Sequence, residues 1–419
     1  MTDRTHLSTQ ACIVGGGPCG VMLGVLLARA GVDAIVLEKY PDFFRDFRGD
    51  TIHPSTLQLL YELGWLDDFL ALRHAEIREI GANIAGQFFQ IADLNHLPIH
   101  CKFIALMPQW DFLNFLTERG RRYPTFHVMM QTEGTDLTED ADGRVTGVRA
   151  KTIAGEIEID ATLVVGADGR HSTIRERAGF EVENLGAPMD VLWMKIAKRE
   201  GDPPQALGTL NDGQFIVLID RIDYWQCAYI IPKGTFERLK AAGLEVLRND
   251  IVRLVPTLRG RVDEIDDWSK VSLLEVRVDR LSRWHRPGLL CIGDAAHAMS
   301  PIGGVGINLA IQDAVAAANR LAAPLRNGTL DEKPLAAIQE RRMFPTKVTQ
   351  AVQVFIQNHA IDPVLQGVHV DRPPLALRLL DEFPRLRGLP ARLIGVGVRP
   401  EHVRTPDLYR SASTTLKYS

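Results

Sequence analysis

Residues 288–308 read GLLCIGDAAHAMSPIGGVGIN, and this stretch decides the fold that we expect. Its apolar run at 289–292 predicts a short buried strand that ends at Gly293-Asp294. Pro301 follows, and three glycines then occur within four positions before a helical pattern begins: Gly303, Gly304 and Gly306. Glycine lets backbone N–H groups approach a ligand closely, and a carboxylate accepts hydrogen bonds from ligand hydroxyls. The stretch therefore predicts a strand that delivers its backbone to a ligand.

A second glycine-rich turn, GGGPCG at 15–20, lies between a predicted buried strand at 11–14 and an Ala- and Leu-rich helix at 21–30. A further strand ends at Glu38, so the segment is a βαβ unit with G-x-G-x-x-G and a terminal acid. In such a unit the glycines and the helix N-terminus bind a pyrophosphate, and the acid binds a ribose diol. We expect a dinucleotide to contact Gly15, Gly17, Pro18, Cys19, Gly20 and Glu38.

The composition is that of an ordinary globular protein, with 46% apolar and 24% charged residues among 419. The formal net charge of −4 gives no support for nucleic-acid binding. No uncharged apolar run is long enough to span a membrane, and the polar N-terminus does not resemble a signal peptide. The five cysteines are dispersed, which indicates free buried thiols in the cytoplasm. We expect no metal site, because His96, His100 and Cys101 lack a second ligand pair.

The order of the patterns predicts an α/β fold with a three-layer, Rossmann-like dinucleotide-binding domain, an inserted and mainly antiparallel β-sheet domain for the substrate, and C-terminal helices. The first domain is expected to be discontinuous and to contain residues 1–75, 100–182 and 278–345. The sheet domain is expected to contain residues 76–99 and 183–277, including one amphipathic helix at 236–252. Residues 346–419 are expected to form a helical region, with a flexible tail after Val403.

Two arginines and one glutamine are further candidates for the ligand site. Arg45 and Arg48 precede a predicted helix at 55–63, where an arginine can cover a phosphate or remain a solvated loop charge. Gln109 lies just before an amphipathic helix, and it can contact a ligand or act as a helix cap.

The aromatic residues of the inserted strands are expected to be mostly core, with one or two lining a pocket. The candidates for substrate contact are Trp193, Phe215 and Tyr224. A base that deprotonates a phenolic substrate is not assigned, although His53 and Tyr224 are possible.

Three motifs together are specific: GGGPCG with Glu38, GADGRHSTIR at 166–175, and GDAAHAMSPIGGVGIN at 293–308. In this order they resemble the para-hydroxybenzoate hydroxylase-like, single-component FAD-dependent aromatic monooxygenases, the class A flavoprotein hydroxylases. The resemblance covers roughly residues 8–340. It implies that FAD is held by its ADP part at the first motif, with Lys39 beside the adenine. A related signature of flavin halogenases is not matched, because WQCAYIIP at 225–232 has the wrong spacing.

The resemblance also implies roles for residues of the other two motifs. Asp168 would be linked to both FAD and NAD(P)H, and Asp294 would hold the ribityl chain. Pro301, with Gly303 and Gly304, would surround the flavin ring. The remaining cofactor contacts implied by the family are Arg48 and Gln109, together with Gly306, Ile307 and Asn308, which would offer backbone and side-chain contacts to the pyrimidine end of the flavin.

In that family NAD(P)H docks transiently and reduces the flavin, which then reacts with O₂ to give a C4a-hydroperoxide that hydroxylates an electron-rich ring. We therefore expect a hydroxylase acting on a hydrophobic aromatic or polyketide-like small molecule, as a monomer or homodimer. Two alternatives stay open: an FAD-dependent reductase or dehydrogenase of an unsaturated or prenyl substrate without oxygen insertion, and a flavin-binding sensor. Oxygen incorporation and anaerobic turnover distinguish them.

Overall fold

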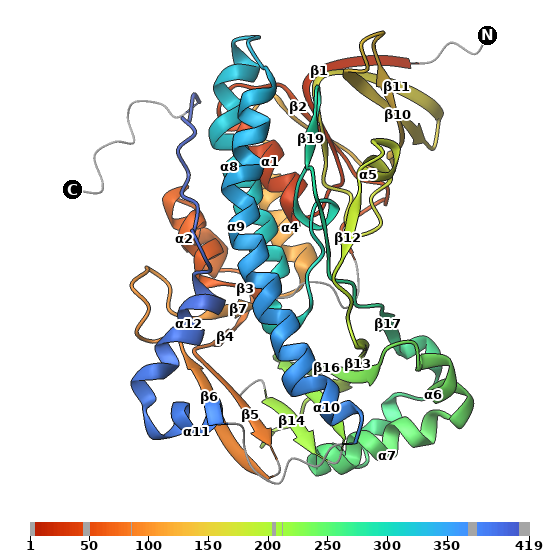
Figure 1. Ribbon diagram of the computed structural model, residues 1–419, viewed down its shortest axis with the longest axis vertical. Coiled ribbons are helices and arrows are strands. Elements are labelled where there is room, and N and C mark those ends of the chain that lie inside the picture. The colour runs from red at the N-terminus through yellow and green to blue at the C-terminus, as the bar shows by residue number, and fades with distance from the viewer. Residues whose placement is uncertain are drawn as a thin grey trace.

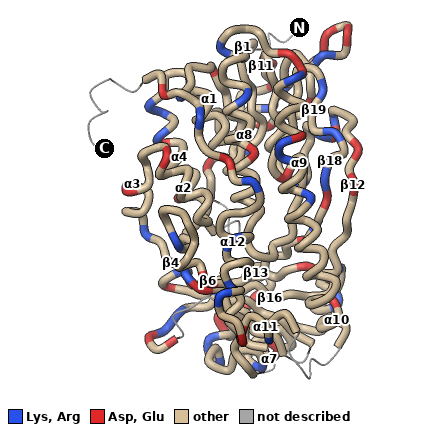
Figure 2. Tube along the Cα trace, turned by 60° about the vertical axis from the view of Figure 1, so that its left-hand side comes forward, with Lys and Arg blue, Asp and Glu red and all other residues tan. Residues whose placement is uncertain are grey.

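The computed structural model describes residues 5–44, 51–84, 86–202, 207–211, 213–367 and 375–409. Figure 1 shows a large sheet and a smaller sheet at opposite ends of the molecule, with helix α9 (Glu332–Ile356) running lengthwise between them. Basic and acidic residues are intermingled along the trace in Figure 2, in keeping with the small net charge. The predicted mixed α/β class is confirmed.

The large sheet carries parallel strands at its centre. Its main path, in spatial order, is β19 (His285–Arg286), β20 (Leu289–Cys291), β11 (Gly155–Gly166), β1 (Thr5–Val14), β2 (Ala34–Leu37) and β8 (Phe126–Met129). β10 (Val145–Thr152) pairs with β11, and β9 (Glu133–Glu139) pairs with β10. Val14 is in register with Gly166 and Leu37, and Gly166 is in register with Cys291. The carboxyl ends of four parallel strands therefore meet at one edge.

The helices around this sheet bury its apolar side chains. α1 (Pro18–Arg29) packs against both α4 (Gln109–Gly120) and α8 (Gly306–Arg326). Residues 19–28 of α1 are all buried, which explains why this helix is apolar on every side. The shorter elements nearby are α2 (Pro54–Glu62), α3 (Leu66–Leu70), α5 (Thr173–Arg177) and a three-stranded sheet of β3 (Thr51–Ile52), β7 (Ile104–Leu106) and β4 (Ala75–Ile77).

The smaller sheet is mainly antiparallel, as expected. Its strands, in spatial order, are β17 (Ser272–Leu274), β13 (Met189–Ala197), β16 (Tyr224–Pro232), β15 (Gln214–Asp220), β14 (Leu207–Asn211), β5 (Glu79–Ile84) and β6 (Gln87–Asp93). Among the described strands only β14 and β5 pair in parallel within it. β12 (Val182–Asn184) and β18 (Asp279–Leu281) form a separate two-stranded ladder. The division of the chain into domains remains a prediction.

The amphipathic helix predicted at 236–252 is wrong as a single helix. The structure has α6 (Phe236–Ala242) and α7 (Leu244–Leu254), separated at Gly243. Gly243 has φ +100° and ψ 155°, a conformation that ends a helix and that glycine adopts without steric cost. The irregular turns after α7 are η1 (Pro256–Leu258), η2 (Val262–Glu264) and η3 (Trp268–Lys270).

The C-terminal region is helical, and part of its expected flexible tail is ordered. After α9 come η6 (Gln357–Ile361), α10 (Asp362–Leu365), α11 (Leu375–Glu382), η7 (Pro384–Arg387) and α12 (Gly388–Gly395). The backbone N–H of Leu408 donates to the Arg29 carbonyl at 3.1 Å, and Thr405 is buried. The expectation of a free tail is therefore wrong for residues 404–409, because they pack against the end of α1; residues 410–419 lie outside the described chain.

All five cysteines are buried and free, which confirms the predicted burial and the predicted lack of disulfides. None of the described helices is both long and apolar enough to cross a membrane.

Candidate cofactor site

The three motifs meet at the carboxyl edge of the large sheet. The Ala167 backbone N–H donates to the Val14 carbonyl at 2.8 Å, and that of Ile292 donates to the Gly166 carbonyl at 3.0 Å. Ligands of open α/β sheets bind at this edge. The edge therefore gathers the first glycine-rich turn, the Asp-Gly turn and the Gly-Asp turn into one candidate site.

The glycines of the first turn divide into two roles. A Cβ on Gly15, which has φ +111°, would lie 2.3 Å from the Ala167 carbonyl oxygen, and one on Gly20 would lie 2.0 Å from the Gly15 carbonyl oxygen. A Cβ on Gly17 would meet nothing within 4 Å. Gly15 and Gly20 thus permit the backbone to pack closely, whereas Gly17 leaves its side open for a pyrophosphate. This cradle fits a dinucleotide.

Two helix N-termini point to this edge without a side-chain cap. α1 begins at Pro18 after Gly17, and α8 begins at Gly306 after Val305. The first N–H groups of a helix have no intrahelical partner and attract negative charge. The Cys19 thiol donates to the Ala310 carbonyl at 3.0 Å and so ties α1 to α8, which leaves Cys19 its backbone for a ligand.

Glu38 lies beside the first turn, as its predicted role requires. Its carboxylate accepts hydrogen bonds from the backbone N–H groups of Gly16 (3.2 Å) and Tyr40 (3.0 Å). Lys39 is exposed, with its ammonium 5.2 Å from the centre of the Tyr40 ring.

Asp168 shapes the second turn. Its carboxylate accepts from the Ser172 hydroxyl at 2.5 Å and from the Ile174 N–H at 3.1 Å, and the Ser172 hydroxyl also caps the N-terminus of α5. Burial raises the pKa of Asp168, and these hydrogen bonds partly oppose the shift. The carboxylate is thus held against α5, and it fixes the backbone that abuts Gly15.

Asp294, in the turn η4 (Gly293–Ala295), joins the second and third motifs. It pairs with the Arg170 guanidinium at 3.3 Å, and both side chains are a little over one quarter exposed. An exposed carboxylate at this place can accept from ribityl hydroxyls. Sequence reasoning did not assign Arg170, although it belongs to the quoted motif and is the charged residue next to Gly169.

The loop with Pro301 enters η5 (Ile302–Gly304). Gly303 and Gly304 have φ +77° and +63°, which explains why glycine is needed at both positions. The Gly304 carbonyl accepts a hydrogen bond from the Thr51 hydroxyl at 3.0 Å. A Cβ on Gly304 would lie 2.7 Å from the hydroxyl oxygen of Thr51. The loop is thus packed closely against β3.

Asn308 is committed to the protein through its side chain. Its amide oxygen accepts from the His53 N–H and the Thr56 hydroxyl, and its amide nitrogen donates to the carbonyls of Thr51 and Gly304. A primary amide can make no more than these four hydrogen bonds. The expected side-chain contact with the cofactor is therefore not supported. The backbone N–H groups available at the start of α8 are those of Gly306, Ile307 and Asn308.

Two predicted contacts cannot be placed, and one can. Arg45 and Arg48 lie outside the described residues. Gln109 was expected just before the helix, but it is the first residue of α4. Its side chain is half-buried.

The aromatic candidates lie on one face of the smaller sheet. Trp193 and Phe215 pack with the apolar cluster that also contacts Ile302 of the Pro301 loop. The strand register places Tyr224 on the same face of the sheet. The opposite face packs on α7. This arrangement places Trp193 and Phe215 toward the third motif.

His53 is fully buried beneath the same loop. One ring nitrogen, Nδ1, lies 2.8 Å from the Ile394 carbonyl, so it must carry the proton and donate. Burial lowers the pKa of His53 to about 4, against the smaller opposing effect of that carbonyl. A neutral imidazole with so low a pKa is a poor base for a phenol, so a structural role is favoured.

A buried ionic group behind the Gly-Asp turn was missed by sequence reasoning. The Asp313 carboxylate of α8 accepts from the Gly293 N–H (3.1 Å), from His297 Nε2 (2.5 Å) and from Arg342 Nε (2.8 Å). Burial acts to raise the pKa of Asp313, but His297 and Arg342 outweigh it, so the pKa lies below its usual value. No spacing in the sequence relates these four residues, which come from three separate elements.

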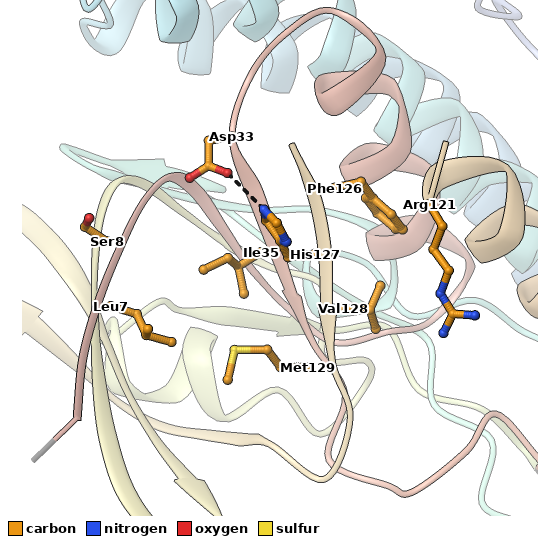
Figure 3. A pocket seen from close by; sticks show the side chains of 9 residues that line it. All are labelled: Leu7, Ser8, Asp33, Ile35, Arg121, Phe126, His127, Val128 and Met129. Carbon is orange, nitrogen blue, oxygen red and sulfur yellow. Dashed lines mark ion pairs between the residues drawn. The ribbon is translucent and has the colours of Figure 1, made fainter. Parts of the chain in front are cut away.

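A hollow of about 520 Å³ lies on the large sheet away from this site (Figure 3). It is lined by all four residues of β8, by Asp33 and Ile35 at the start of β2, and by Leu7, Ser8 and Arg121, and the ion pair between His127 and Asp33 lies among them. No residue of the three motifs lines this hollow, so it is not the cofactor site.

The fold and the three turns define a dinucleotide-binding protein with a single cofactor site. Residues 8–352 match the model of a family described as FAD binding domain, and the chain belongs to this family. It is 34% identical to 6-methylpretetramide 4-monooxygenase from Streptomyces rimosus over 409 residues, covering 97% of this chain and 96% of the relative. Para-nitrophenol 4-monooxygenase from Pseudomonas sp. (strain WBC-3) is 24% identical over 363 residues, covering 79% and 82%.

A solved structure, anhydrotetracycline hydroxylase from Streptomyces rimosus, superposes with a TM-score of 0.74 at 22% identity, over 94% of this chain and 77% of that one. At this identity the likeness shows a shared fold. The family, the FAD cofactor and the monooxygenase class predicted from the three motifs are confirmed.

Proposed function

We propose that the protein uses NAD(P)H and O₂ to hydroxylate a hydrophobic aromatic or polyketide-like small molecule at its bound FAD. The observation that carries the proposal is the register of β1, β11 and β20, which brings all three motifs to one edge. The names of the relatives support a phenolic or polyketide ring over an unsaturated or prenyl substrate without oxygen insertion. The five buried free thiols suit a reducing cytoplasm.

The residues of the chain would divide the work as follows. The open side of Gly17 and the α1 N-terminus bind the pyrophosphate, and Glu38 accepts from the adenosine ribose. Asp294 accepts from the ribityl hydroxyls, and the N–H groups at the start of α8 meet the pyrimidine end of the flavin. FAD supplies the redox and oxygen chemistry when bound.

The protein also has to hold the substrate and exclude water. Trp193 and Phe215 offer an apolar wall opposite the Pro301 loop. Because the pKa of His53 is lowered to about 4, we assign no substrate base to it. We expect the electron-rich character of the ring to come from the substrate itself.

An oxygen-labelling experiment tests the proposal. Purified protein is reconstituted with FAD and incubated with NADH or NADPH, phenols or polyketide aromatics, and ¹⁸O₂. We expect substrate-stimulated NAD(P)H oxidation and one ¹⁸O atom in the product. Product formation without O₂ would instead support a dehydrogenase or reductase, and failure to bind FAD would reject the proposal altogether.

A further inference from the structure

One face of the longest helix, α9, is polar and yet buried. Its members recur at helical spacing, continue into the first residue of η6 and are almost fully shielded from solvent: Arg342 (1% exposed), Thr346 (0%), Gln350 (0%), Gln353 (3%) and Gln357 (0%). We call this set the α9 polar stripe. Burying amides costs free energy unless they are hydrogen-bonded, so a buried stripe of this kind requires partners.

The side-chain amide nitrogens of the three glutamines each donate to the loop that carries Pro301. Gln350 donates to the Ala298 carbonyl at 3.1 Å, and Gln357 donates to the Ser300 hydroxyl at 3.0 Å. Gln357 is the first residue of the π-helical turn η6, which follows α9 directly. Turns of this kind are frequent at functional sites.

Gln353 holds backbone groups of the two residues that flank Pro301, Ser300 and Ile302. Its amide nitrogen donates to the carbonyls of Ser300 and Ile302, each at 2.9 Å, and its amide oxygen accepts from the Ser300 N–H at 3.2 Å. Proline fixes one backbone angle of this segment, and Gln353 fixes its neighbours on either side. The position of the loop is thus determined by a side chain fifty positions later.

We propose that Gln353 is a positioning residue that sets the flavin-ring environment by holding the Pro301 loop. This inference rests on the proposed function, because the loop matters for the ring only if FAD is bound as described. An apolar side chain of the same size would fill the space but would leave three backbone groups without partners. The loop would then sample other positions and admit water to the ring, so that two electrons from NAD(P)H would reduce O₂ to H₂O₂ without hydroxylation of the substrate.

The test uses full-length protein with Gln353→Met, which keeps the length of the side chain and removes its hydrogen bonds. The matched control is Gln339→Met. Gln339 lies on the same helix and also donates to one carbonyl (Ser282) and accepts from one N–H (Trp284), both at 2.9 Å, but away from the loop.

The main readout is hydrogen exchange of the Gly304 amide without FAD. This amide donates to the Pro301 carbonyl, so it reports the position of the loop and not the direct loss of Gln353. We expect exchange to rise by roughly tenfold in Gln353→Met and to stay at the wild-type rate in Gln339→Met, although both melt at a lower temperature. With FAD, Gln353→Met should shift the visible flavin spectrum and increase the fraction of NAD(P)H electrons that end as H₂O₂.

A second variant, Gln353→Glu, keeps an acceptor for Ser300 but places a carboxylate against two carbonyls, and it should behave like Gln353→Met. Wild-type exchange in Gln353→Met, or an equal effect in Gln339→Met, would overturn the inference. Failure of both Gln353 variants to fold would also overturn it, because the role would then be global. The exchange measurement needs no turnover, so an inactive wild type would reject the proposed function without deciding this inference.

Discussion

The turn at 15–20 takes its shape from backbone atoms, since a Cβ on Gly15 or Gly20 would collide with a carbonyl oxygen. The loop at 293–304 takes its shape from distant side chains, because Asp313 holds its start and Gln353 holds the peptides around Pro301. Both reach the same edge of the large sheet. One half of the site is therefore encoded locally, and the other is imposed by α8 and α9.

Replacing Asp313 should have the largest effect, because the loop at 293–304 depends on a buried ion pair between α8 and α9. Asp313→Asn removes the nearer of the two carboxylates that neutralise the buried Arg342, which then keeps only Glu401 at 3.4 Å; breaking such a buried pair typically costs about 3–5 kcal/mol. We expect this loss in denaturant unfolding at pH 7, with much weaker FAD binding by fluorescence. The exposed pair Arg283–Glu332 is the control, and Glu332→Gln should change stability by less than about 0.5 kcal/mol. Equal losses in both variants would break the comparison.

The pKa of Asp313 is lowered in the folded protein, so its ionised form stabilises the fold above the unfolded pKa. That contribution is lost as the pH falls through the folded value. Asp313→Asn should therefore show less acid destabilisation than the wild type.

His53 gives the next largest effect and acts at milder pH. Burial lowers its pKa from 6.5 to about 4, so between these values the unfolded chain binds a proton that the folded chain does not. Stability should fall as the pH drops through this window, by up to roughly 3 kcal/mol from this group. His53→Asn can still donate to the Ile394 carbonyl, and it should flatten the profile measured by urea unfolding. An unchanged profile would show that His53 is solvated.

The locally encoded turn is tested by two glycines with opposite expectations. Gly20→Ala places a Cβ 2.0 Å from the Gly15 carbonyl oxygen and should cost about 1–3 kcal/mol. Gly17→Ala meets no atom within 4 Å, so its melting temperature should remain near that of the wild type while FAD affinity falls. Calorimetry and FAD titration measure both quantities. A stable Gly20→Ala protein would contradict the backbone origin of this turn.

The smallest effect is expected at the second motif, in the N-cap of α5. Ser172→Ala removes the N-cap of α5, in which the hydroxyl accepts from the Arg175 N–H at 2.9 Å, and should cost about 1 kcal/mol. FAD affinity should change little, because Asp168 keeps its bond to the Ile174 N–H. Ser172→Thr should restore most of the stability.

The sequence predicts the locally encoded features and misses the imposed ones. The βαβ unit at 11–38 and the cap at Ser172 follow from patterns a few residues long, and both are present. The stripe on α9 could not be predicted, because glutamines at helical spacing are typical of a solvent face. The protein contacts of the Asn308 side chain could not be predicted for a related reason, since its partners Thr51 and Thr56 lie some 250 positions earlier.

Helix α9 also constrains how this scaffold can be recombined. Gln353 holds the cofactor loop, while Ile356 and Ile361 a few positions later pack with strands of the smaller sheet. Consider a chimera that takes this sheet from a relative and has its crossover within α9. Its Gln353 would still match the native loop, but the helix residues that follow would have to pack on a sheet from another protein. Crossovers that keep residues 332–365 with the donor of the sheet, and bring in the matching 293–304 loop, should preserve both.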